Sequence, residues 1–255
     1  MASDELPGPT EIDREGRIAL AVGLGLSVVL LAVPFARFIL SYLGVLVHEL
    51  GHSVVSWIFG YPALPAFDFT YGGGVSLSFD RNGGLVLLIL AAWGFLLWFY
   101  RSYPRMLGLL GGLFALWAVL AVTPLHEALG IAMGHGAELV FAAIFLYRAA
   151  TGSGCKIPEV ERPLYAMVGW FLVLESAWFA WGLVTDPGKR QLYADAKGGG
   201  HWMDFSRLAI DYAHVSLETV AGAFLLGCLL TPVVTWAFLR YRKRVGGWAE
   251  RWLAR

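Results

Sequence analysis

Residues 35–59 read FARFILSYLGVLVHELGHSVVSWIF, and this stretch decides how the rest of the chain is interpreted. It exceeds the roughly 20 apolar residues that a membrane-spanning helix needs. Inside it, His48 and His52 frame an HExxH motif. On a helix the two imidazoles project from one face, one turn apart, where they can bind one divalent cation. Glu49 lies beside them and can act as a general base on a water molecule that the metal activates. Ionisable groups are costly in hydrocarbon, so the motif predicts a metal site.

The composition is typical of a polytopic membrane protein. Of the 255 residues, 58% are hydrophobic and 15% are charged, and the formal net charge is zero. A chain without excess positive charge gives no reason to expect a nucleic-acid partner. Cys155 and Cys228 are too few and too far apart to predict a disulfide framework. Residues 1–17 are acidic and polar, lack the basic start of a secretory signal, and are expected to form an exposed tail.

Apolar segments separated by helix-breaking residues predict an all-α bundle of six or seven transmembrane helices. The segments are residues 18–33, 35–59, 85–100, 106–122, 124–147, 164–184 and 205–239. The first two meet at Pro34 and could form one bent element, so both counts remain open. Residues 18–239 are expected to form the metal-binding bundle. Residues 240–255 are expected to form a basic tail on an anionic membrane surface.

Residues 60–84 predict a short strand-like or re-entrant element directly after the HExxH helix. They are rich in Gly and Pro, and Val75-Ser76-Leu77-Ser78-Phe79 alternates apolar and polar residues. Non-helical backbone is tolerated at membrane depth only where protein or a water-filled cavity covers it. Gly73, Gly74 and Val75 are therefore candidates for presenting an extended peptide substrate as an added strand.

Other apolar segments also carry ionisable residues. The candidates are His135, Glu138, Glu175, Asp211, His214 and Glu218. Counted at about 1.5 Å per residue, three of them, His135, Glu175 and His214, are expected at about the same depth in the membrane as His52. Of the six candidates, the first two are three residues apart, and the last three follow i, i+3 and i+7, so each set predicts one helix face. Burying so many ionisable groups without a cation would be expensive, which favours metal ligands.

For some polar residues an ordinary structural role is the better interpretation. Glu175 could simply form a hydrogen bond between helices. His126 and Glu127 follow Pro124 and are expected near the membrane interface. His201 and Asp204 lie in or beside a Gly-rich loop and are expected at the surface.

The chain resembles the site-2 protease family of intramembrane zinc metalloproteases, in particular its small bacterial members. The resemblance rests on His48-Glu49-Leu50-Gly51-His52 and on Gly72-Gly73-Gly74 shortly after it, and it covers about the first hundred residues. It implies that His48 and His52 hold zinc, that Glu49 is catalytic, and that the substrate is a transmembrane peptide or protein. It also implies an integral protein of the bacterial inner membrane.

The third zinc ligand cannot be assigned in the same way. In the family it is an Asp on a later helix, within an Asn/Pro-rich segment that ends Leu-Asp-Gly, and this chain has no such segment. Asp211 matches that ligand by residue type, and His135 matches it by depth. Basic residues predict the orientation, because the positive-inside rule places the C-terminal cluster, 240–244, in the cytoplasm.

Surplus ligands leave two other functions open. The surplus residues are Glu138, Glu175, His214 and Glu218. They could contact the metal ligands without binding the ion themselves, or they could hold a second cation, as in helical bundles with two iron or manganese ions. Such a protein would be a dimetal membrane enzyme, for example an oxidoreductase. The remaining alternative is a non-proteolytic, metal-binding membrane subunit.

Overall fold

The computed structural model of the chain describes residues 11–67, 73–199 and 203–253. Within them, six helices are long and apolar enough to cross a membrane. They are α1 (Arg14–Ala32), α2 (Pro34–Ile58), α4 (Pro104–Val122), α5 (Leu125–Thr151), α6 (Pro158–Thr185) and α9 (Leu217–Leu253). The helix α3 (Gly83–Phe99) is apolar but shorter. The predicted class, a helical membrane bundle, is confirmed, and the chain is an integral membrane protein.

Prolines set where several helices begin. Pro34 starts α2 directly after Val33, whose backbone is extended, so α1 and α2 are separate helices rather than one bent element. Pro104 and Pro158 start α4 and α6 in the same way. Proline suits this position because the first helical N–H groups have no partner within the helix.

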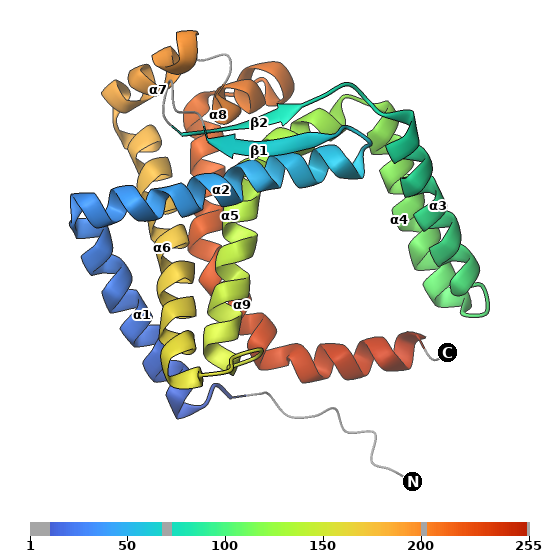
Figure 1. Cartoon of the computed structure of the whole chain (residues 1–255), viewed down its shortest axis with the longest axis horizontal. Helices are drawn as coiled ribbons and strands as arrows, with labels where there is room; N and C mark the ends of the chain where they lie inside the picture. Colours follow the sequence, from blue (N-terminus) through green and yellow to red (C-terminus); the bar gives the residue numbers. More distant parts are fainter. Residues whose placement is uncertain (1–10, 68–72, 200–202, 254–255) are drawn as a thin grey trace.

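The centre of the bundle is α6, which packs against α1, α5 and α9. In Figure 1 these helices run in a similar direction, while α2 crosses them steeply at one end of the bundle. Small residues allow the close approach of α2 and α5. A Cβ atom on Gly51 of α2 would overlap the backbone oxygen of Met133 and the Cβ of Ala137 in α5. The HExxH helix is thereby held directly against α5.

A two-stranded antiparallel hairpin covers α2, as the alternation after the HExxH helix predicts. It consists of β1 (Ala63–Phe67) and β2 (Gly74–Ser78), with Leu64 opposite Leu77. The Ser53 and Ser76 hydroxyl oxygens lie 3.0 Å apart and join α2 to β2. In addition, Trp57 Nε1 donates to the carbonyl of Ala63 at 2.8 Å. These bonds fix β2 above the HExxH residues.

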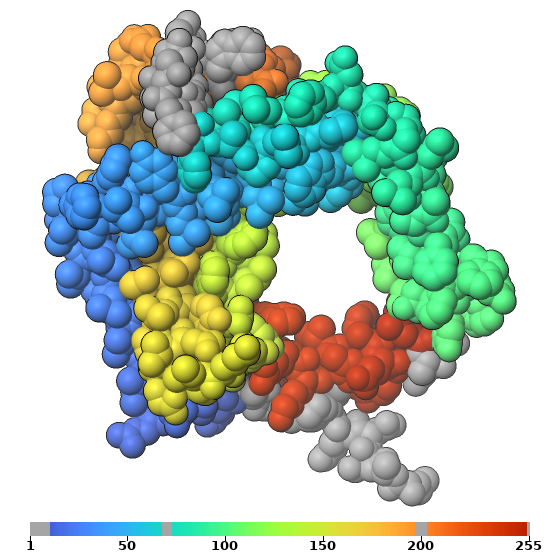
Figure 2. All heavy atoms as spheres, viewed as in Figure 1, coloured from blue at the N-terminus to red at the C-terminus, as the bar shows by residue number. Residues whose placement is uncertain are grey.

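Helices α3 and α4 form a pair that stands apart from the bundle. Figure 2 shows an opening between this pair, α2 and the C-terminal part of α9. The pair joins the bundle near the end of α2, where Trp117 Nε1 donates to the carbonyl of Ile58 at 2.9 Å. Val55, Phe59, Trp117 and Ala121 form a buried cluster there.

The expectation of one continuous helix over residues 205–239 is wrong. Helix α7 (Pro187–Gly199) is followed by the single turn α8 (Asp204–Arg207) and by a π-helix, η1 (Leu208–Ala213). His214 then adopts a left-handed conformation with φ of 53°, and α9 begins only at Leu217. This break separates Asp211, His214 and Glu218, so they do not share one helix face.

Candidate metal centre

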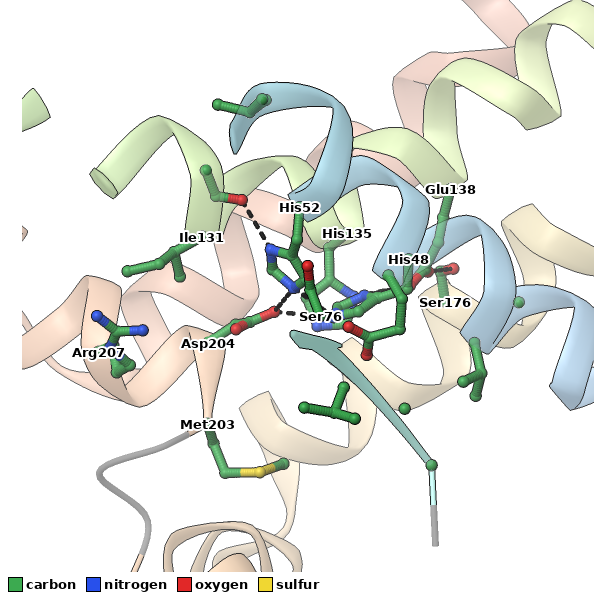
Figure 3. A pocket seen from close by; sticks show the side chains of 18 of the residues that line it. His48, His52, Ser76, Ile131, His135, Glu138, Ser176, Met203, Asp204 and Arg207 are labelled. Atoms are coloured by element: carbon green, nitrogen blue, oxygen red, sulfur yellow. Dashed lines mark hydrogen bonds and ion pairs between the residues drawn. The ribbon is translucent and has the colours of Figure 1, made fainter. Parts of the chain in front are cut away.

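The HExxH residues line a cavity of about 970 Å³ between α2, β2, α5, α6 and the α7–α8 region. His48, Glu49 and His52 enter it from α2, and His135 and Glu138 enter it from α5. Asp204, the first residue of α8, enters from the opposite side (Figure 3). The cavity is large enough for a short peptide segment.

Three potential ligand atoms converge on one point of this cavity. His48 Nε2 and His52 Nε2 lie 3.0 Å apart. Asp204 Oδ2 lies 2.9 Å from the first and 3.1 Å from the second. Each of the three side chains is 16% exposed. We call these residues the His48/His52/Asp204 triangle.

The other ring nitrogens of both histidines are occupied. His52 Nδ1 lies 2.8 Å from the carbonyl oxygen of Gly130, which can only accept, so this nitrogen carries the proton. His48 Nδ1 lies 2.9 Å from Glu138 Oε1 and donates in the same way. In the neutral rings both Nε2 atoms therefore present lone pairs toward each other and toward a carboxylate. A bound cation is the natural partner for three such atoms.

Asp204 is a candidate ligand that the sequence does not indicate, and the expectation that it lies at the surface is wrong. Its Oδ2 atom is buried and has no partner with hydrogen-bond geometry among the described residues, although both imidazoles are close. An isolated Asp after a Gly-rich loop does not, from the sequence alone, indicate a metal ligand.

His135 and Glu138 form a second layer around His48. His135 Nδ1 lies 3.0 Å from Glu138 Oε1, the atom that also accepts from His48. The hydroxyl of Ser176 donates to Glu138 Oε2 at 2.5 Å. One ligand atom each from His48, His135 and Asp204 also lie within 4.8 Å of one another, so this group could hold a metal ion. His135 is thus a further candidate ligand for an ion held by His48 and Asp204.

Glu49 lies in the same cavity but contacts a different wall. It is 6% exposed, and a Cβ atom on Gly74 would stand 2.5 Å from its Cγ and Oε1 atoms. Gly73, Gly74 and Val75 all line the cavity, whereas the described part of β1 does not. The structure therefore places the HExxH carboxylate directly beneath β2.

The remaining predicted site residues lie outside this cluster. Asp211 is 3.9 Å from Arg207, Glu218 pairs with Arg190 at 3.0 Å, and His214 is exposed. Glu175 lines the cavity, but its carboxylate is paired with Arg37 at 2.9 Å. Within the described residues, no second group with His214, Glu218 or Asp211 is assembled that could hold a cation.

Comparison of the chain with protein-family models, with curated protein sequences and with solved structures gave no match. The interpretation of the site therefore depends on its geometry alone. This geometry shows a polytopic helical membrane protein with a buried group of histidine and aspartate side chains that could hold a metal ion.

Proposed function

We propose that this protein is an intramembrane zinc metalloprotease that cleaves a membrane-embedded peptide. The observation that carries the proposal is the convergence of His48 Nε2, His52 Nε2 and Asp204 Oδ2, at 2.9–3.1 Å from one another. Two of these ligands belong to HExxH, and the third comes from a segment far along the chain. The proposed membrane is a bacterial inner membrane, with the C-terminus in the cytoplasm.

The triangle fits zinc by distance and by donor type. Nitrogen and oxygen ligands at about 2.0–2.1 Å in a tetrahedron stand roughly 3.3 Å apart, close to the separations in the triangle. Three protein ligands leave a fourth position for water or substrate, as in catalytic rather than structural zinc sites. When bound, zinc would lower the pKa of a water molecule and polarise the scissile carbonyl.

Glu49 supplies the proton transfers in this proposal. Its carboxylate lies in the ligand-lined cavity, next to His48 in sequence and beneath β2. It would take a proton from the attacking water and deliver it to the departing amine. Burial of the side chain, which is 6% exposed, keeps competing bulk water away from it.

The hairpin offers a means of holding the substrate. A helical peptide hides its carbonyl groups, so cleavage requires a locally extended segment. Gly73, Gly74 and Val75 of the cavity wall could pair with such a segment through backbone hydrogen bonds. The partner implied is a transmembrane peptide or protein that unwinds near the metal centre.

No specific observation favours the dimetal alternative. Of the residues expected to hold a second cation, His214 and Glu218 lie outside the cluster. Glu175 is paired with Arg37, and Glu138 accepts from His48 and His135. A non-proteolytic metal-binding subunit would retain the triangle but have no need for Glu49 in the cavity.

The proposal is tested by hydrolysis in lipid nanodiscs. Wild-type protein is expected to cleave members of a set of labelled transmembrane peptides, and Glu49→Gln is expected to lose this activity by at least a hundredfold while retaining zinc. Asp211→Ala is the matched control and should remain active. If Glu49→Gln and wild type hydrolyse equally, or if neither hydrolyses any peptide while zinc is bound, proteolysis is rejected.

A further inference from the structure

The C-terminal part of α9 extends beyond the length that a membrane span requires. Figure 1 shows it turned away from the direction of α5 and α6 and directed toward the α3–α4 pair. Pro232 lies within α9 and removes one helical hydrogen bond, which allows such a bend. Protein contacts fix the position of the segment. Arg242 donates to the hydroxyl of Tyr147 near the end of α5, at 2.8 Å, and Arg105 at the start of α4 donates to the carbonyl of Trp252, at 2.7 Å.

These contacts place residues 240–253 at the level where two membrane spans end. Tyr147 is in the last turns of α5 (Leu125–Thr151), and Arg105 is the second residue of α4 (Pro104–Val122). The ends of apolar spans lie at the headgroup region of a bilayer. A helix of this length extends about 20 Å along that region.

The segment is amphipathic. Tyr241, Val245, Trp248 and Trp252 follow i, i+4, i+7 and i+11, which is one face of a helix. Trp248 is 60% exposed and Val245 is 50% exposed, so the chain itself leaves this face largely uncovered. The rings of Trp248 and Trp252 stack at 6.3 Å. Tryptophan and tyrosine side chains favour the boundary between headgroups and acyl chains.

Basic residues border the aromatic face of the segment. Residues 240–253 contain five basic side chains and a single acidic one, Glu250. Arg240, Arg244 and Arg251 follow i, i+4 and i+11 and therefore lie along one side of the helix, about a quarter of a turn from the aromatic face. A helix whose aromatic face is bordered by arginine residues is a pattern that lies in the plane of a membrane interface.

We propose that residues 240–253 form an interfacial helix that binds anionic lipid headgroups. The aromatic face enters the acyl boundary, and the arginine side chains that border it reach the headgroup phosphates. This binding site is independent of the metal centre and does not depend on its chemistry. Each basic residue near an anionic surface strengthens binding by roughly fivefold.

The first test places a fluorescent label on each face in turn. Trp248→Cys and Lys243→Cys are made in a Cys155→Ser background, because Cys228 is buried. In nanodiscs with one third phosphatidylglycerol, the label at 248 should be quenched by lipid-attached quenchers. The label at 243 should be quenched by iodide in water. Iodide quenching of both labels would overturn the proposal, as would failure of the lipid-attached quenchers to reach the 248 label, which indicates that protein covers this face.

The second test addresses the anionic headgroup. Spin-labelled phosphatidylglycerol should associate with the full chain in preference to spin-labelled phosphatidylcholine. The triple variant Arg240→Gln, Arg244→Gln and Arg251→Gln should lower that preference several-fold. Neutralising Arg81, Lys189 and Arg190 removes the same charge elsewhere and should leave it unchanged. No preference in the wild type, or an equal loss in both variants, overturns the proposal. A variant that misfolds is recognised by a lowered melting temperature. In that case the two fluorescent labels, at 248 and 243, still test the proposal.

Discussion

Asp204 and Asp211 are of the same residue type and close in sequence, yet only Asp204 reaches the histidines. Asp204 Oδ2 lies 2.9 Å from His48 Nε2, whereas Asp211 is 3.9 Å from Arg207. The pairing of His48 with His52 could be read from the sequence because helix geometry alone places residues i and i+4 on one face. The approach of Asp204 to these histidines could not be predicted in this way, because the position of Asp204 depends on the path of the chain before and after it.

At the residue scale, Glu138 should act through His48 as a positioning residue. Glu138→Gln replaces an acceptor of two imidazole N–H groups by an amide and should weaken zinc binding about 10–100-fold. Ser176→Ala removes one donor to the same carboxylate and should have a smaller effect. Competition with a fluorescent chelator measures the affinity, and an unchanged dissociation constant for Glu138→Gln would contradict this role.

At the element scale, glycines allow α2, α5 and β2 to meet around the candidate metal centre. The alternation that predicted the hairpin is visible in the sequence because residues in a strand alternate between two faces. The break at η1 has no comparable signal, since Leu208–Ala213 is apolar enough to continue a helix. The approach of α5 to α2 was equally hidden, because the role of a glycine depends on what packs against it.

Gly134 of α5 provides the space for both imidazole rings. A Cβ atom there would overlap the ring of His52 and stand 2.8 Å from His48 Cε1. Gly134→Ala should therefore reduce zinc binding by at least tenfold although alanine favours helices. Gly130→Ala on the same helix is the control, because its nearest neighbour is Val55 Cγ1 at 3.8 Å. Isothermal titration with zinc compares the two, and equal affinities would show that the rings tolerate the added methyl group.

Gly74 of β2 holds the strand directly against Glu49. Gly74→Ala would place Cβ 2.5 Å from Glu49 Cγ and so displace the carboxylate or the strand. We expect a loss of at least tenfold in kcat with zinc content preserved, since no ligand is touched. Gly83→Ala, which has nothing within 4 Å, should behave as wild type. Zinc loss in Gly74→Ala would place this glycine in the metal centre rather than beside it.

At the scale of the whole molecule, the cavity is assembled from segments at both ends of the chain. Helix α2 supplies His48 and His52, and α8 supplies Asp204 from more than 150 residues later. Hydropathy predicts the spans because hydrocarbon demands apolar residues. It does not predict which polar residues meet, because that depends on how α2 crosses α5 and on how α7 returns the chain to the cavity.

A metal that joins distant segments should stabilise the entire fold. Zinc at a hundred times its dissociation constant contributes about 2.7 kcal/mol, which corresponds to a rise in Tm of roughly 5–10 °C for a chain of this size. Chelation with EDTA should reverse that rise in wild type and have no effect in Asp204→Ala. A melting temperature that is insensitive to chelation in wild type would mean that no ion links α2 to α8.

The most direct test of the central claim is the metal content of purified protein, measured by mass spectrometry for wild type, Asp204→Ala and Asp211→Ala in parallel. We predict one zinc ion per chain in wild type and in Asp211→Ala, and none in Asp204→Ala. Two iron ions in wild type, or a full zinc ion retained by Asp204→Ala, would contradict it.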